Sequence, residues 1–276
     1  MIRFTAQHTG ITGRLAGKTI AISTSDVDDP GARDLSPIRQ RDLVVELARQ
    51  LLAMEARIAY GGDFRKAGIM ELLVEVQRAQ ARSTVDASPR IVSYLLETLG
   101  VEERAGYFDA VEFFDVRFLD FDLVADDSAA ARALGKAMSL RAMRCEIARD
   151  MDALVVVGGR TSGFTGWRPG IAEEIAAASA AGKPVYLVGG FGGVAGWYAQ
   201  AAFRGCKIPS APPPSGLGVE TNGELALPSA REVVRTLQVR MWRNGLTNAE
   251  NAHLAQTMDA DEIVALVLSG LQKISN

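Results

Sequence analysis

The chain has 276 residues, of which 48% are apolar and 23% charged, and its formal net charge is -3. This much apolar material can bury a sizeable core, while the small negative charge argues against nucleic acid as a partner. With only two histidines and two cysteines, we expect no metal site and a reduced, cytoplasmic protein. The sequence also has no apolar stretch of about eighteen residues, so we expect no membrane partner.

Short apolar strands alternate with amphipathic helices over the first two hundred residues. In chain order the patterns predict strand 18–24, helix 37–54, strand 57–60, helix 68–80, strand 90–95, an aromatic β-prone stretch 110–124, helix 128–149, strand 152–157, helix 170–181, strand 184–188 and a helix ending near 203. The strands are nearly continuous in apolar residues, which is typical of strands covered on both faces. The order predicts an α/β fold: a doubly wound, Rossmann-like, mostly parallel sheet flanked by helices.

A proline-rich segment follows at residues 206–222, and its three consecutive prolines exclude regular structure there. We interpret it as a surface loop, because the residues after it are too few for a core of their own. The prediction is therefore one domain over residues 1–276, with helices in 223–276 packed back on it. These helices are expected near 230–242, 248–256 and 259–271.

Glycine pairs come directly after three of the strands, at Gly61-Gly62, Gly158-Gly159 and Gly189-Gly190. Such pairs let the backbone turn tightly and approach a ligand, while the next helix offers free N–H groups to phosphate. The alternative is that these glycines only end strands, as in many α/β proteins. No junction is a GxGxxG followed by an acidic residue about twenty positions later, which argues against an ordinary dinucleotide-dependent dehydrogenase.

The second junction carries the most informative segment, residues 158–174. Pro169 stands where a proline helps to start a helix, and Glu173 and Glu174 then fall in its first turn. A carboxylate there could hold ribose hydroxyls, or it could merely complement the helix dipole. Trp167 in the same loop could stack on a base or anchor the loop to the core.

Asp-Ala-Leu-Val-Val-Val-Gly-Gly at 152–159, then Pro-Gly-Ile-Ala-Glu-Glu at 169–174, resembles the SLOG superfamily. Ile-Ser-Thr-Ser-Asp at 22–26, Ala-Tyr-Gly-Gly-Asp-Phe-Arg at 59–65 and Asn-Gly-Leu-Thr-Asn-Ala-Glu-Asn at 244–251 fit the branch associated with bacterial TIR proteins. The resemblance implies a protein that binds or senses ADP-ribose, cyclic ADP-ribose or an NAD-like molecule. It also implies a TIR-domain or other effector protein as partner.

The phosphoribohydrolases of this superfamily imply an alternative, cleavage of a nucleotide N-glycosidic bond. They carry a compact Pro-Gly-Gly-x-Gly-Thr-x-x-Glu-Glu loop and an arginine on the preceding helix. Here Val157 replaces the proline, and ten residues separate Gly159 from Gly170. Alignment on Asp152 puts Met143 at the arginine position, so Arg144 is the nearest candidate and Arg141 also lies on this helix.

Three functions thus stay open: a ligand sensor, a nucleotide N-glycosidase, and a scaffold whose glycines only end strands. For an enzyme, the catalytic residues would be Glu174, Glu173 and Arg144. The residues expected to bind the ligand are Ser23, Thr24, Ser25, Gly61, Gly62, Asp63, Arg65, Gly158, Gly159, Arg160, Thr161, Gly163, Gly170, Glu173, Glu174, Gly189 and Gly190. We expect no cofactor, and we expect a symmetric homo-oligomer, since α/β domains with amphipathic helices frequently form one.

Overall fold

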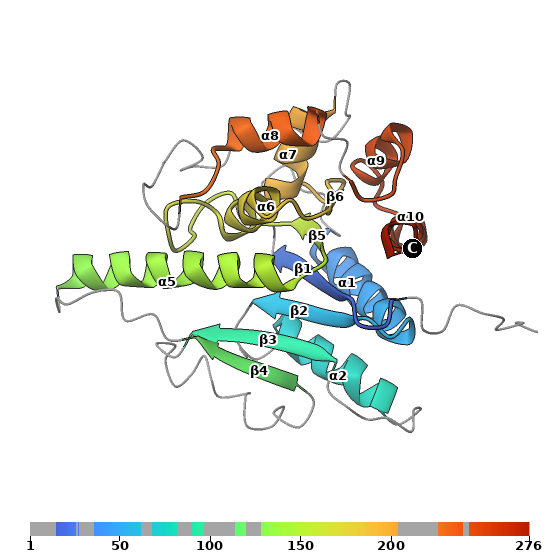
Figure 1. The fold of residues 1–276 in the computed structure, drawn as a ribbon, viewed down its shortest axis with the longest axis horizontal. Coiled ribbons are helices and arrows are strands. Elements are labelled where there is room, and N and C mark those ends of the chain that lie inside the picture. Colours follow the sequence, from blue (N-terminus) through green and yellow to red (C-terminus); the bar gives the residue numbers. More distant parts are fainter. Residues whose placement is uncertain are drawn as a thin grey trace, which may run out of the picture.

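The computed structural model describes residues 15–25, 27, 36–61, 68–81, 90–96, 114–119, 128–203, 226–239 and 243–275. Its centre is one sheet of six strands in the order β4-β3-β2-β1-β5-β6, and every neighbouring pair is parallel (Figure 1). The strands are β1 (Thr19–Ser25), β2 (Arg57–Gly61), β3 (Ile91–Leu96), β4 (Phe114–Leu119), β5 (Ala153–Gly158) and β6 (Val185–Val188).

Helices lie on both faces of the sheet (Figure 1). They are α1 (Ser36–Ala53), α2 (Ile69–Ala81), α5 (Ala129–Asp150), α6 (Gly170–Ala180), α7 (Gly193–Ala202), α8 (Ala230–Val239), α9 (Asn248–Leu254) and α10 (Ala260–Ser275). This arrangement confirms the predicted doubly wound α/β fold. The β-prone stretch contributes β4, whereas the proline-rich segment 206–222 lies outside the described residues. Among the described helices, none combines the length and apolarity needed to cross a membrane.

Successive side chains of a strand face opposite sides of the sheet, and the two faces have separate cores. Ile20 and Ile22 of β1 pack with side chains of α1, α2 and α10. Ala21 packs with side chains of α5, α6, α7 and α8. Small residues on this second face let α5 come close to β2: a β-carbon at Gly61 would lie 2.7 Å from Ile147 Cδ1.

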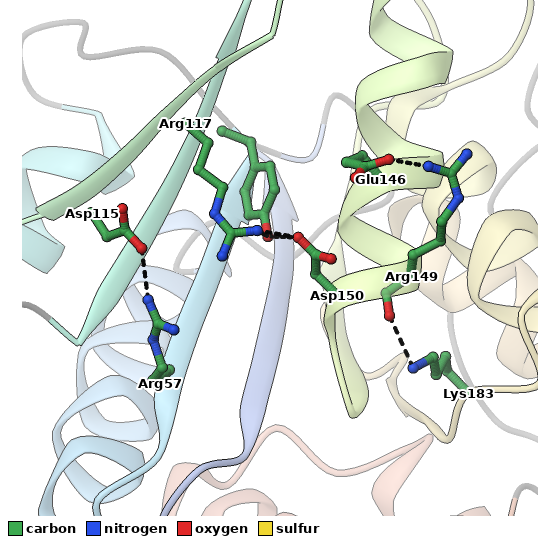
Figure 2. A network of polar contacts seen from close by, with 8 residues as sticks. Arg57, Asp115, Arg117, Glu146, Arg149, Asp150 and Lys183 are labelled. Atoms are coloured by element: carbon green, nitrogen blue, oxygen red, sulfur yellow. Dashed lines mark hydrogen bonds and ion pairs between the residues drawn. The ribbon is translucent and has the colours of Figure 1, made fainter.

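A polar network ties the outer strand β4 to the end of α5 (Figure 2). Arg117 of β4 is ion-paired with Asp150, the last residue of α5, and also donates to the hydroxyl of Tyr94 at 3.1 Å. The Tyr94 hydroxyl in turn donates to Asp150 Oδ2 at 2.7 Å. Burial and this hydrogen bond raise the pKa of Tyr94, so it remains a neutral donor within the network.

The other outer strand, β6, is joined to the C-terminal segment by two buried asparagines. Asn244 Nδ2 donates to Val185 O at 2.9 Å and to Asn251 Oδ1 at 2.8 Å. Tyr186 of β6 donates from its hydroxyl to the backbone oxygen of Asn244 at 2.7 Å. Apolar residues of α9 and α10 belong to the same core as Tyr186, so the segment Asn-Gly-Leu-Thr-Asn-Ala-Glu-Asn joins these helices to the sheet. Leu254, Ile263 and Val267 are among them.

Candidate functional site

The sheet reverses its strand order between β1 and β5. The chain runs outward from β1 through β2 and β3 to β4, and then returns to place β5 and β6 on the opposite side of β1. Ser25 and Gly158 stand side by side at the carboxyl ends of β1 and β5. In sheets of this type, ligands bind outside the strand ends at this position. The predicted residues of β1 and of the second glycine junction therefore meet at the place where a site is expected.

The first two residues of the glycine loop turn back on β1. Gly158 and Gly159 have φ angles of 66° and 106°, in the region that favours glycine. The N–H of Gly159 donates to Ser25 O at 3.1 Å, and that of Arg160 donates to Ser25 Oγ at 3.2 Å. Both amides are thus engaged within the protein. These two amides are therefore not available to bind an anion.

On the face of the sheet covered by α1, Gln40 is hydrogen-bonded to the last two residues of β1. Its Nε2 donates to Thr24 Oγ1 at 2.7 Å and to Ser25 O at 2.9 Å, while its Oε1 is buried without a hydrogen-bond partner. A β-carbon at Gly158 would lie 2.6 Å from this oxygen. Gln40 is not among the residues predicted from the sequence, although its position in α1 was informative. It continues the apolar stripe of α1 from Leu43 by one turn, where a polar residue is unusual.

On the opposite face, two arginines of α5 hold the buried carboxylate of Glu173. Arg141 approaches Glu173 Oε1 with Nε at 3.1 Å and Nη2 at 2.6 Å, and Arg144 Nη1 lies 2.5 Å from Oε2. The side chains of Arg141 and Glu173 are completely buried. We call Arg141, Glu173 and Arg144 the ion triad. Because both oxygens of Glu173 are bound by guanidinium groups, its main effect is to fix the two arginines.

Glu174 has a different environment, although it is the next residue of α6. Its side chain is 20% exposed, and the Arg144 Nε atom lies 3.7 Å from its Oε1, too far for a hydrogen bond. Burial raises the pKa of Glu174, with the Glu173 charge adding to the effect, while Arg144 and the Ser23 hydroxyl oppose it. Ser23 Oγ and Arg144 Nε are both buried and make no hydrogen bond of normal geometry.

The N-terminus of α6 lies against Arg144. Pro169 is the N-cap residue and offers no side-chain acceptor to the first turn, so the first N–H groups of the helix are uncapped within the part of the chain that the structure describes. A β-carbon at Gly170 would lie 2.7 Å from Arg144 Nη2. An uncapped helix start beside a guanidinium group is a favourable place for an anion such as phosphate or carboxylate.

The loop between β5 and α6 is anchored near its end. The Arg141 guanidinium carbon lies 4.4 Å from the centre of the Trp167 ring, the distance of a cation–π contact. The buried Arg168 donates from Nη1 to Pro228 O at 2.7 Å. This contact anchors the loop to the buried Arg141, whereas stacking of Trp167 on a base stays a prediction. The middle of the loop is exposed, including Gly163 at a φ of 62°.

The third glycine junction packs against other parts of the backbone. Gly190 faces the carbonyl oxygen of Thr257, in the turn between α9 and α10, so closely that a β-carbon there would clash. The N–H of Val194, in the first turn of α7, donates to Gly159 O at 3.1 Å. This junction therefore joins α7 to the glycine loop and the C-terminal helices to the sheet.

The structure thus divides the predicted residues into groups. Those gathered around the strand reversal are Ser23, Ser25, Arg144, Gly158, Gly159, Arg160, Gly170, Glu173 and Glu174. Thr24 faces α1, Gly61 lies beneath α5 and Thr161 is buried. Gly62, Asp63 and Arg65 lie outside the described residues. Within the described ranges, no group of three histidine, cysteine or acidic side chains could hold a metal ion.

Comparison with known proteins adds a family to this geometry. No curated protein matches the chain. The family model described as SLOG cluster2 matches residues 14–207, which is more than half of the chain and includes all six strands and the helices from α1 to α7. The protein with this parallel sheet and this ion triad belongs to the SLOG superfamily.

Proposed function

We propose that the protein binds and senses a nucleotide-derived ligand where β1, β5 and α6 meet. One observation carries the proposal: the uncapped start of α6 meets Arg144 and the partly exposed Glu174 beside the strand reversal. Membership of the SLOG superfamily supports a ligand related to nucleotides, since the family suggests nucleotide-related binding or processing.

In this proposal an anionic group of the ligand lies at the first turn of α6. The free N–H groups and the positive end of the helix dipole favour a phosphate there. Arg144 Nη2 lies beside Gly170 and adds a full charge. Because Glu173 keeps Arg144 in place through Nη1, the guanidinium group need not be ordered when the ligand arrives, which reduces the entropy cost of binding.

Glu174 and Ser23 would hold the sugar. An ionised carboxylate accepts hydrogen bonds from two vicinal hydroxyl groups, and Glu174 is the carboxylate of the pair that the triad leaves available. Ser23 Oγ is buried beside it and makes no hydrogen bond of normal geometry. A ribose hydroxyl would supply such a bond, which removes the cost of an unsatisfied buried group.

The resemblance to TIR-associated SLOG domains narrows this ligand to ADP-ribose, cyclic ADP-ribose or an NAD-like molecule. The protein then acts with a TIR-domain or other effector protein that makes or responds to the ligand, or it sequesters the ligand. We further propose that it works as a homo-oligomer in the cytoplasm. The assignments of the ligand and of the effector partner depend on the ligand class and fail with it.

A second function, hydrolysis of an N-glycosidic bond, is favoured by the environment of Glu174. Its partial exposure and the upward shift of its pKa by burial suit a group that exchanges a proton with water or substrate. In that reaction water adds to C1′ of the ribose, the bond from C1′ to the base nitrogen breaks, and the base leaves with a proton.

Thermal shift with a panel of nucleotides, followed by chromatography of each mixture, separates these functions. A ligand at a hundred times its dissociation constant stabilises the folded state by about 2.7 kcal/mol. Stabilisation with the nucleotide recovered intact supports the sensor, and release of free base supports the hydrolase. Glu174→Gln should abolish either effect, whereas Glu146→Gln, at an exposed ion pair on α5, should leave it unchanged. A panel without any shift or turnover would overturn both.

A further inference from the structure

We infer that Trp167 is a positioning residue, which holds Arg144 at the start of α6 through a cation–π contact with the other arginine of the ion triad. The contact of Trp167 is with Arg141 and not with Arg144 itself. The Arg141 guanidinium carbon lies 4.4 Å from the centre of the Trp167 ring. The inference rests on the proposed function in one respect: the position of Arg144 affects ligand affinity only if Arg144 binds the ligand.

The contacts form a chain of three steps. The Arg141 guanidinium carbon lies over the Trp167 ring, 4.4 Å from its centre. Arg141 binds Glu173 Oε1 through Nε and Nη2 in the same plane, at 3.1 Å and 2.6 Å. Glu173 then binds Arg144 through its second oxygen, at 2.5 Å from Nη1. Each group is fixed by the one before it, so the position of the indole ring is transmitted to Arg144.

Burial makes each of these three contacts costly to lose. Arg141 and Glu173 have no exposed side-chain surface, and Arg144 has 9%. In such a place a guanidinium group that loses one contact cannot replace it with water at low cost. The cation–π contact is accordingly stronger here than at an exposed site.

The position of Trp167 places this series of contacts between the exposed part of the loop and the start of α6. It stands three residues before Gly170, where α6 begins and where Arg144 Nη2 approaches the backbone. The exposed residues Ser162, Gly163 and Thr165 precede it in the same loop. A ligand that contacts this loop can therefore change the position of Arg144 through Trp167, and a ligand held by Arg144 can order the loop.

The test compares Trp167→Leu, which removes the aromatic face, with Trp167→Phe, which keeps a weaker one. Trp197→Phe is the control, because Trp197 packs edge to face with Tyr198 in α7. The first measurement is the side-chain Nε–H signal of Arg144 in a ¹H–¹⁵N spectrum without ligand, identified by its loss in Arg144→Lys. We expect Trp167→Leu to move or broaden this signal, Trp167→Phe to restore most of it, and Trp197→Phe to leave it in place. An unchanged Arg144 signal in Trp167→Leu would overturn the inference.

The second measurement is the affinity for ADP-ribose by calorimetry. We expect Trp167→Leu to weaken binding about tenfold, as the loss of a buried cation–π contact predicts. In the Arg144→Lys background the same change should have little further effect, since both act through one group. Additive losses in the double variant would contradict the inference. If the wild-type protein binds no nucleotide, the proposed function fails, while the Arg144 signal still decides the role of Trp167.

Discussion

Glu173 and Glu174 are consecutive residues, but only Glu173 is neutralised. Arg141 and Arg144 bind both of its oxygens, whereas Glu174 has a single ion-pair contact at 3.7 Å and a side chain that is 20% exposed. Adjacent residues of a helix point about 100° apart, so one faces α5 and the other the strand reversal. The two carboxylates therefore have separate environments, which is the basis for proposing a positioning role for Glu173 and ligand contact for Glu174.

Glu173→Gln should strongly destabilise the protein. The change leaves two buried guanidinium groups without their common counter-charge, which costs about 3–5 kcal/mol for a buried pair. Urea unfolding measures the loss. Glu174→Gln, in the neighbouring position, should cost less than about 1 kcal/mol. Equal losses in the two variants would show that the carboxylates do not divide their roles in this way.

The free energy of unfolding should depend on pH through Glu174. Its folded-state pKa lies above the ordinary value of 4.5 because burial disfavours the charged form. The contribution of Glu174 to stability is therefore fully present below pH 4.5, and it is lost as the pH rises through the folded-state pKa. Relative to Glu174→Gln, the wild-type protein should lose stability over this interval. A difference between the two proteins that stays constant with pH would contradict the shift.

Gly158→Ala should be more harmful than Gly182→Ala, although their φ angles are nearly equal at 66° and 67°. Both changes place a side chain in the left-handed region, at about 1–2 kcal/mol. At Gly158 the new β-carbon would also lie 2.6 Å from Gln40 Oε1, whereas at Gly182 nothing lies within 4 Å. We expect an additional loss of about 1–3 kcal/mol in urea unfolding. Repeating Gly158→Ala in a Gln40→Ala background should remove that excess; if the excess remains, Gln40 is not its cause.

Asn244→Ala should weaken the attachment of the C-terminal segment to β6. It removes the donor to Val185 O and leaves the buried Asn251 amide with fewer partners. Each unsatisfied buried group costs about 1–3 kcal/mol. Asn248→Ala, at an exposed position nearby, should change stability by less than about 0.5 kcal/mol. Hydrogen exchange should then show faster exchange in α9 and α10 for Asn244→Ala alone.

The strand and helix pattern was sufficient to predict the fold, because buried parallel strands and amphipathic helices are visible locally. The segment of the candidate site was also visible in the sequence, since Glu173, Glu174 and Pro169 lie close together after a strand, and its use by a ligand stays a prediction. What could not be predicted depends on contacts across the chain. The two carboxylates look alike in the sequence, and only the position of α5 determines which of them meets Arg141.

Contacts between distant parts of the chain also explain why the surroundings of each glycine could not be predicted. Glycines at strand ends and helix starts look alike in sequence, but the structure packs Gly61 beneath Ile147, Gly190 against Thr257 and Gly170 beside Arg144. The partners come from α5 and from the turn between α9 and α10, more than sixty residues away for Gly61 and Gly190. Sequence reasoning assigned all of these glycines to the ligand, and that assignment stays a prediction for each.

The asparagine contact at β6 limits how this protein can assemble. Outer strands of a sheet tend to recruit further strands through their free backbone groups. Here Asn244 Nδ2 donates a hydrogen bond to the carbonyl oxygen of Val185, and the Tyr186 hydroxyl donates one to the backbone oxygen of Asn244. A second copy that approached along β6 would have to displace this contact. Self-association should therefore proceed through helix faces or the β4 end, and the sheet is protected from growing into a filament at β6.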